Sequence, residues 1–166
     1  MSDSLASTAD GRRVTRGVPR VSTGETTRFA VDDQKGYLTT STAADGGLGE
    51  VTIRMAKQGS TLAGMMDALG AAISLGLQAG APVEVFVSKF ANMRFAPAGR
   101  TDDPELPLAA SLMDYVARRL AVDYLPAEQR GELGILTAAE RTAQINADEE
   151  AWADLPGMAM SAPRES

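Results

Sequence analysis

The chain has 166 residues, with 16 basic and 22 acidic side chains and a formal net charge of −6. It contains neither cysteine nor histidine, which excludes disulfides, thiol redox chemistry, thiolate or imidazole metal sites and the most common general base. Its acidic balance disfavours nucleic acid as a partner of the folded part, and no apolar run is long enough for a membrane span, so we expect a cytoplasmic protein without membrane contact.

The first 24 residues are rich in Ser, Thr, Gly and Arg and show no apolar periodicity. Residues 1–24 are therefore predicted to form a disordered arm. Four arginines make it locally basic: Arg12, Arg13, Arg16 and Arg20. Such a run could contact an acidic partner or RNA, although a solvated tail is the simpler interpretation.

Three strands are predicted after this arm. Residues 28–31 and 37–42 are short β-branched or aromatic stretches, joined by a polar turn. A glycine-containing turn at residues 43–47 follows. Val51, Ile53 and Met55 then alternate with other residues, which is the pattern of a half-buried strand. Short connections between consecutive strands predict an antiparallel meander with one covered face.

The principal helix is predicted to begin at Ser60 or Thr61, either of which can cap it, and to end near Gly80. Its apolar residues recur at helical spacing: Leu62, Met65, Met66, Leu69, Ile73 and Leu77. It also contains three glycines: Gly64, Gly70 and Gly76. Each glycine costs about 1 kcal/mol relative to alanine, which is tolerable where another backbone lies close. The helix should therefore be buried against the sheet, the next helix or both.

A second helix is predicted from Pro82 to about Phe90, followed by a loop to residue 101. A third helix should span about residues 106–124, with one apolar face: Leu108, Leu112, Tyr115, Val116 and Leu120. The pairs Asp114–Arg118 and Arg119–Asp123 have the spacing of salt bridges on its exposed side. Short amphipathic pieces around residues 127–133 and 138–145 precede a loosely ordered acidic tail.

Together these patterns predict an α+β fold, in which a three-stranded antiparallel meander packs against about three helices and the ends are flexible. We divide the chain into a disordered basic arm at residues 1–24, a folded domain at 25–125, and short helices with an acidic tail at 126–166.

One candidate site lies where the last strand leads into the principal helix. The N–H groups at a helix start, with a nearby lysine, make Lys57, Ser60 and Thr61 a plausible anion site. The glycines and the Lys-Ser/Thr pair of a P-loop are missing, and a plain helix cap is the simpler explanation.

The other candidate site is the basic loop after the second helix. It carries Lys89, Asn92 and Arg94 beside Phe90 and Phe95, and such a loop could hold a ligand or meet a partner. Alternatively, both phenylalanines attach the loop to the core while the charges face water. Both interpretations stay open from the sequence.

The remaining conspicuous side chains are given structural roles. Three adjacent carboxylates are expected to favour the start of the following helix: Asp102, Asp103 and Glu105. Three methionines are expected to fill the core: Met65, Met66 and Met113. Trp152 could attach the tail to the domain or to a partner. No set of nucleophile, base and orienting group and no metal-ligand spacing is present, so we predict no catalytic or metal-binding residues.

Several segments together resemble a known family: residues 35–39, 49–51, 55–68, 89–99 and 111–115. Over about residues 29–124 they are similar, in order, to the C-terminal accessory region of adenosylcobalamin-dependent (class II) ribonucleotide reductases. Residues 55–68 carry the most specific part of the resemblance. In the broader family this region is called the TSCPD domain. Here residues 110–114, Ala-Ser-Leu-Met-Asp, take the place of that motif, without its Cys and Pro.

The resemblance implies that residues 25–125 form a free-standing TSCPD-type accessory domain, related to ribonucleoside-diphosphate reductase and deoxyribonucleotide synthesis. Its expected partner is the reductase catalytic chain or a second copy of itself. Adenosylcobalamin and the active-site cysteines belong to the longer enzyme, so no cofactor is expected on this chain. Because ribonucleotide reduction needs thiols, a chain without cysteine is not expected to catalyse it.

The expected contact residues come from the 55–68 junction and the 89–99 loop: Lys57, Ser60, Thr61, Lys89, Asn92, Arg94 and Phe95. A second hypothesis is an independent module that binds phosphate or a nucleotide at the Lys57–Thr61 junction, with Arg94 nearby.

Overall fold

The structure is a computed structural model that describes residues 17–153. The predictions made for residues 1–16 and 154–166 lie outside the described residues. Within residues 17–153, no helix combines the length and the apolar character needed to cross a bilayer.

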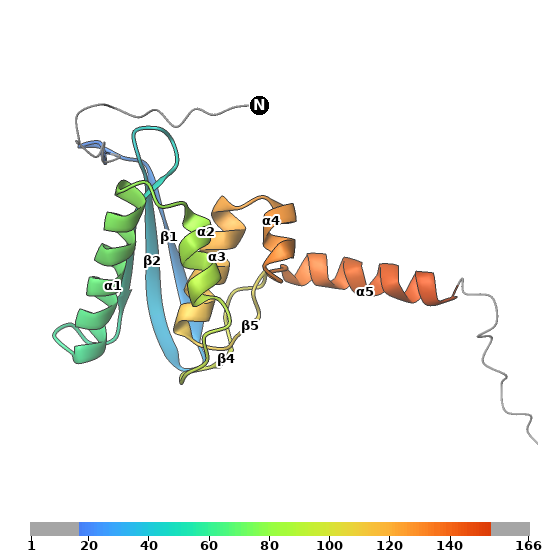
Figure 1. Ribbon diagram of the computed structural model, residues 1–166. Coiled ribbons are helices and arrows are strands. Elements are labelled where there is room, and N and C mark those ends of the chain that lie inside the picture. The colour runs from blue at the N-terminus through green and yellow to red at the C-terminus, as the bar shows by residue number, and fades with distance from the viewer. Residues whose placement is uncertain (1–16, 154–166) are drawn as a thin grey trace, which may run out of the picture.

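A three-stranded antiparallel meander forms the centre of the fold, as predicted (Figure 1). It consists of β1 (Gly24–Val31), β2 (Gln34–Thr42) and β3 (Leu48–Met55) in the order β1-β2-β3. Val31 pairs with Gln34, so only two residues form the first turn. The alternation places one set of apolar side chains on the inner face: Phe29, Val31, Leu38, Val51, Ile53 and Met55. The opposite face carries mainly polar and charged side chains.

The principal helix, α1 (Thr61–Gln78), begins where the sequence predicts. The Ser60 hydroxyl accepts a hydrogen bond from the Ala63 N–H at 3.2 Å, so Ser60 is the N-cap. Met66, Ile73 and Leu77 point into the core, while Met65 is 62% exposed. The expectation that Met65 fills the core is therefore wrong, because adjacent positions on a helix point about 100° apart.

Helix α1 covers the outer edge of β3. The Ser74 hydroxyl accepts a hydrogen bond from the Val51 N–H at 2.9 Å. It also lies 2.8 Å from the Gly70 carbonyl and 3.1 Å from the Val51 carbonyl, to either of which it can donate. A Cβ atom added at Gly70 would lie 2.9 Å from the Val51 carbonyl oxygen. Gly70 therefore permits the close backbone approach that we expected, whereas nothing lies within 4 Å of the corresponding position at Gly64.

Two further helices cover the inner face: α2 (Val83–Phe90) and α3 (Leu112–Tyr124). Figure 1 shows α1 on one side of the strands and α2 and α3 on the other. The Tyr115 ring of α3 stacks on Phe29 of β1, with ring centroids 4.7 Å apart. One continuous core joins the sheet to these three helices.

The third helix is shorter than predicted. Residues before it form a small hairpin of β4 (Gly99–Arg100) and β5 (Leu108–Ala109). Pro104 and Pro107 disfavour helix in this stretch, and the Ser111 hydroxyl caps α3 by accepting from the Asp114 N–H at 3.0 Å. Leu108 is 65% exposed and does not share the apolar face of α3.

The hairpin also places the acidic segment against β1. The Ala30 N–H donates to Asp102 Oδ1 at 2.6 Å, and Val31 forms a bridge with Thr101. The expectation that Asp102, Asp103 and Glu105 favour a helix start is wrong, because these carboxylates accept hydrogen bonds or form ion pairs elsewhere.

Two more helices follow: α4 (Ala127–Glu132) and α5 (Ala138–Ala153). Helix α5 extends from the body and buries none of its residues; it also continues beyond the predicted 138–145 piece (Figure 1). Its start is fixed by a capping box, in which the Glu140 N–H donates to the Thr137 hydroxyl and the Thr137 N–H donates to the Glu140 carboxylate. Arg130 of α4 binds Glu140 through two nitrogens, at 2.7 and 2.8 Å.

Candidate functional site

A buried carboxylate attaches the loop after α2 to the start of α3. Asp114 is 1% exposed and accepts hydrogen bonds from the Asn92 N–H at 2.6 Å and the Ala110 N–H at 2.8 Å. Arg118 Nε donates to the same carboxylate at 2.8 Å. The (i, i+4) pair of Asp114 and Arg118 is therefore present, but it lies in a half-buried contact and not on an exposed side of the helix.

Asn92 belongs to this same contact. Its φ is 64°, in the left-handed region that Asn adopts more readily than most residues. Its side-chain oxygen accepts a hydrogen bond from Arg118 Nη2 at 2.8 Å. Of the predicted contact residues, Asn92 thus helps to hold the loop, and its side-chain oxygen already has a protein partner.

The outer surface of this loop is apolar and basic. Phe95 is 40% exposed, Met93 is similarly exposed, and Lys89 and Arg94 face solvent. Phe90 is half-buried and packs against the core. The interpretation in which both phenylalanines attach the loop to the core therefore holds for Phe90 and not for Phe95.

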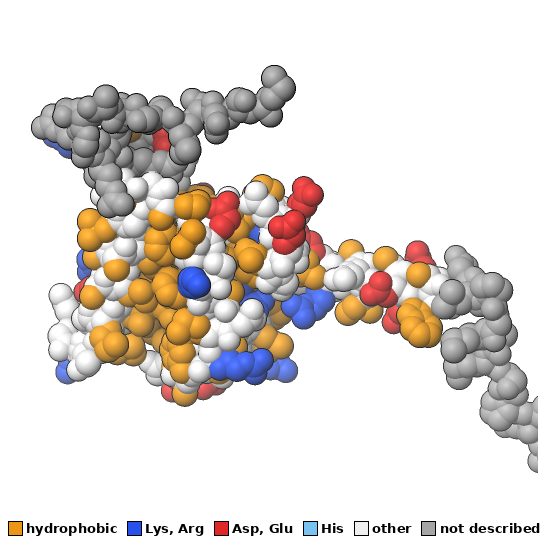
Figure 2. Space-filling view, in the orientation of Figure 1, with side chains coloured by type: hydrophobic (Ala, Val, Ile, Leu, Met, Phe, Trp, Pro, Cys, Tyr) orange, Lys and Arg blue, Asp and Glu red, His pale blue; other side chains and the backbone are white. Residues whose placement is uncertain are grey.

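The helices carry further exposed hydrophobic side chains. Exposed large hydrophobic side chains occur on α1, on α2 and in the loop: Met65, Leu75, Val85, Met93 and Phe95. Figure 2 shows hydrophobic side chains gathered over α1 and α2 on one face of the molecule. We call this set of five residues the apolar surface. Exposed hydrophobic side chains that gather on one face are typical of a protein–protein contact.

The Lys57–Thr61 junction has a different character. Lys57 and Thr61 are exposed, while the Ser60 hydroxyl is used by the helix cap. No hydrogen bond or ion pair in the described chain joins residues 57–61 to Arg94, although the second hypothesis groups them. The structure therefore does not bring the two predicted sites together through direct contacts.

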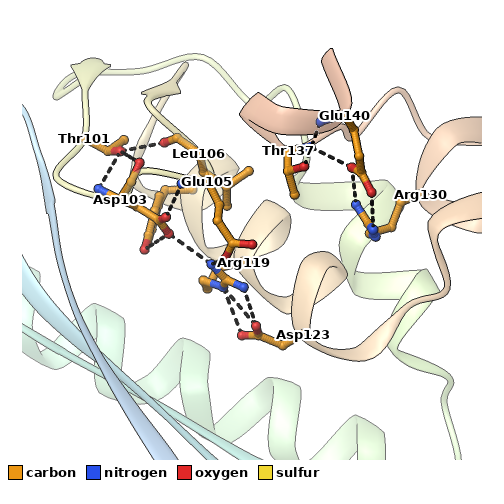
Figure 3. A network of polar contacts seen from close by, with 10 residues as sticks. Thr101, Asp103, Glu105, Leu106, Arg119, Asp123, Arg130, Thr137 and Glu140 are labelled. Carbon is orange, nitrogen blue, oxygen red and sulfur yellow. Dashed lines mark hydrogen bonds and ion pairs between the residues drawn. The ribbon is translucent and has the colours of Figure 1, made fainter. Parts of the chain in front are cut away.

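A second buried network, which the sequence analysis missed, surrounds Arg119 of α3. Figure 3 shows its guanidinium between Asp103 and Glu105 on one side and Asp123 on the other. The Tyr115 hydroxyl donates to Asp103 at 2.9 Å. The pair of Arg119 and Asp123 is present as predicted, but Arg119 is buried.

The electrostatics of this network favour its charged carboxylate and neutral phenol. Burial alone would raise the pKa of Asp103, but hydrogen bonds from Tyr115, the Glu105 N–H and Arg119 outweigh it and lower that pKa below its usual value. Burial and the neighbouring Asp103 raise the pKa of Tyr115. These residues link α3 to the segment before it and keep their protonation states near neutral pH. We therefore interpret the network as structural.

The start of α3 could have been predicted from the sequence. Ser111 and Asp114 have the Ser-x-x-Asp spacing of a helix N-cap, which signals a start at residue 112. The Tyr115–Asp103 contact has no local signal, because the two residues belong to different elements.

The TSCPD domain family matches residues 9–124 of this chain. A vitamin B12-dependent ribonucleotide reductase from Streptantibioticus cattleyicolor is 50% identical over 159 residues, covering 93% of this chain and 26% of that protein. The reductase of the same name from Streptomyces avermitilis is 51% identical over 158 residues, covering 92% and 16%. That from Rhodopirellula baltica is 42% identical over 100 residues, covering 60% and 10%.

The chain therefore spans about a quarter or less of the length of these relatives. No solved structure matches it. Residues 110–114 match the letters T-S-C-P-D at Ser111 and Asp114, the two residues that start α3 and hold the loop. With the family match covering most of the described strands and helices, the chain belongs to the TSCPD domain family.

Proposed function

We propose that this chain is an accessory domain of an adenosylcobalamin-dependent ribonucleotide reductase, and that it docks on the catalytic part of that enzyme without performing a chemical step. The observation that carries the proposal is the similarity to vitamin B12-dependent ribonucleotide reductases over 92–93% of this chain, in a sequence that contains no cysteine. Because ribonucleotide reduction consumes thiols, the contribution of this domain is shape and contacts.

The apolar surface is the proposed docking surface. Aromatic residues, Met and Arg are enriched in protein interfaces, and the loop presents Met93, Arg94 and Phe95 side by side in the sequence. The carboxylate of Asp114 holds the base of this loop through two backbone N–H groups. A loop fixed in this way loses little conformational entropy on binding, which favours affinity. Lys89, beside it on α2, extends the positive charge of the surface.

The cavities found on the described residues are small for cobalamin. The cavities described on residues 17–153 have volumes of about 260–330 Å³, at the lower end of small-molecule sites. We therefore assign the cofactor to the rest of the reductase, and a cytoplasmic location remains a prediction from the sequence.

A binding experiment tests the docking proposal. The 166-residue chain would be titrated, by calorimetry or interferometry, into a B12-dependent reductase from the same genome whose own copy of this region has been deleted. We expect micromolar or tighter binding and a change in turnover. Absence of binding at micromolar concentrations would overturn the proposal, and light scattering of the chain alone would show whether the surface serves self-association instead.

Matched variants test the surface. Met93→Asp and Phe95→Asp place a charge in the proposed interface and should weaken binding at least ten-fold, because burying an unpaired carboxylate is costly. Ile145→Asp makes the same kind of change on α5, where Ile145 is also exposed, and should leave binding unchanged. Equal effects of the loop variants and of the α5 control would exclude this surface, provided that circular dichroism shows all variants folded.

A turnover assay tests the absence of chemistry. The purified chain, supplied with adenosylcobalamin, a dithiol and ribonucleotide, should form no deoxyribonucleotide. Measurable product would contradict the argument from the missing thiols.

A further inference from the structure

The outer face of the sheet carries an aromatic ring between two arginines. Tyr37 of β2 pairs directly with Arg28 of β1 on one side and with Arg54 of β3 on the other. Tyr37 is 51% exposed, and both arginines face solvent, so no described helix covers this row of side chains. The next row along the strands consists of Thr26, Thr39 and Thr52, which supplies hydroxyl groups beside the ring.

A cavity of about 290 Å³ lies beside this ring. Its lining includes Lys35, Tyr37 and Arg54 from the sheet and Gln58 and Asp67 from the junction and helix α1. Its volume is close to the lower limit of about 300 Å³ for small-molecule sites. It is therefore large enough to receive most of a ligand of mononucleotide size, the remainder lying over the open sheet.

The two cations of this cavity have no ion-pair partner among the described residues. Arg28 forms an ion pair with Asp102 at 3.4 Å. Within the described residues, Lys35 and Arg54 form no ion pair, and Asp67 lies in the same cavity wall without a salt bridge to either. On a purely solvated strand face, charges opposite one another usually alternate in sign. Here two arginines flank an aromatic ring, and only one of them has a carboxylate partner.

This combination matches the chemistry of a nucleotide. A flat half-exposed ring stacks on a base, and guanidinium and ammonium groups bind phosphate oxygens. The Asp67 carboxylate accepts hydrogen bonds from sugar hydroxyls or from an exocyclic amine, which gives a role to the one acidic group in the wall. The net charge of −6 opposes a long polyanion, so a single nucleotide suits the site better than an oligonucleotide.

We propose that the outer face of the sheet binds a mononucleotide, whose base stacks on Tyr37 and whose phosphate groups contact Lys35 and Arg54. None of the five residues of the apolar surface lines this cavity, so the variants that test nucleotide binding differ from those that test docking. Docking and nucleotide binding can therefore fail or succeed separately in experiments.

Calorimetric titration of the full chain tests the proposal with four probes: ADP, adenosine, inorganic pyrophosphate and a ten-residue single-stranded oligonucleotide. ADP should bind more tightly than adenosine or pyrophosphate, because only ADP engages the ring and the cations together. Absence of ADP binding up to millimolar concentration would overturn the proposal. Tighter binding of the oligonucleotide than of ADP would also overturn it in favour of a nucleic-acid surface.

Variants locate the binding on this face. Tyr37→Ala should weaken ADP binding roughly ten-fold or more, while Tyr37→Phe retains the stacking surface and should bind like the parent. Arg54→Gln should weaken ADP and pyrophosphate but not adenosine. Arg141→Gln removes a cation from α5, outside the cavity, and should have no effect. Unchanged ADP affinity in Tyr37→Ala or Arg54→Gln would refute the assignment, and the folded Tyr37→Phe variant controls for stability.

Discussion

Replacement of Asp114 by alanine should loosen the loop after α2 and destabilise the whole domain. The substitution removes the acceptor of the Asn92 and Ala110 N–H groups and the partner of Arg118. Hydrogen bonds to a charged group are worth about 1.5–3 kcal/mol each, but water can replace part of them at these half-buried positions. We therefore expect a loss of about 2–4 kcal/mol in the free energy of unfolding, a large share of the roughly 5–15 kcal/mol typical of a domain.

Two measurements check this prediction. Urea unfolding followed by circular dichroism gives the stability loss, and the melting temperature should fall by roughly 4–16 °C. Amide hydrogen exchange should show faster exchange at Asn92 and Ala110, whose N–H groups lose their acceptor. Asp114→Asn retains one carbonyl acceptor and should cost less than Asp114→Ala.

A matched control separates this contact from a general effect of charge. Asp148→Asn removes a carboxylate from the exposed helix α5 and should change stability by less than about 0.5 kcal/mol. A loss below about 1 kcal/mol for Asp114→Ala, with unchanged exchange at Asn92 and Ala110, would refute the assigned role.

Three further predictions concern packing and pH. In urea unfolding, Gly70→Ala should destabilise the protein by about 1–3 kcal/mol because the added Cβ meets the β3 backbone. Gly64→Ala has open space around the added Cβ and should stabilise the protein by about 0.5–1 kcal/mol. The opposite order would contradict the packing of α1 on β3. Hydrogen bonds, first of all from Arg130, lower the pKa of Glu140 to about 2, and the pKa of Asp103 is also lowered, so both carboxylates contribute stability only while ionised. The free energy of unfolding should therefore fall as the pH decreases from about 4.5 towards 2. A constant free energy of unfolding over this range would exclude this contribution. Tyr115→Phe should lower the free energy of unfolding by about 1 kcal/mol near neutral pH. Because the raised pKa of Tyr115 means that its neutral form stabilises the fold, the variant should also lose less stability than the parent above pH ~10. Identical alkaline unfolding curves for variant and parent would argue against the Asp103 contact.

Local signals in the sequence predicted the elements well. The alternation of Val51, Ile53 and Met55 gave the correct inner face of β3, and Ser60 caps α1 as expected. These features depend on neighbouring residues only, so the chain pattern suffices to recognise them. The glycine at position 70 was also correctly linked to a close backbone approach.

The errors arise where distant residues decide the outcome. The helical periodicity of residues 106–111 was overridden by Pro107 and by the Ser111 cap, so this segment pairs with residues near Gly99. The acidic residues before this segment were assigned to the start of a helix, but Asp103 binds Tyr115 and Arg119 across the fold. The row of Tyr37 with two arginines depends on strand register, which the sequence does not reveal without the pairing partners.

The contact between α1 and β3 also protects the folded chain against polymerisation. A strand at the margin of a sheet can recruit a strand from another molecule, and proteins avoid this by obstructing that margin. Here the Ser74 hydroxyl accepts a hydrogen bond from the outward N–H of Val51. At the other margin, the Asp102 carboxylate accepts one from the N–H of Ala30. The sheet can thus leave its polar face open to solvent without offering either of these positions for intermolecular β-addition.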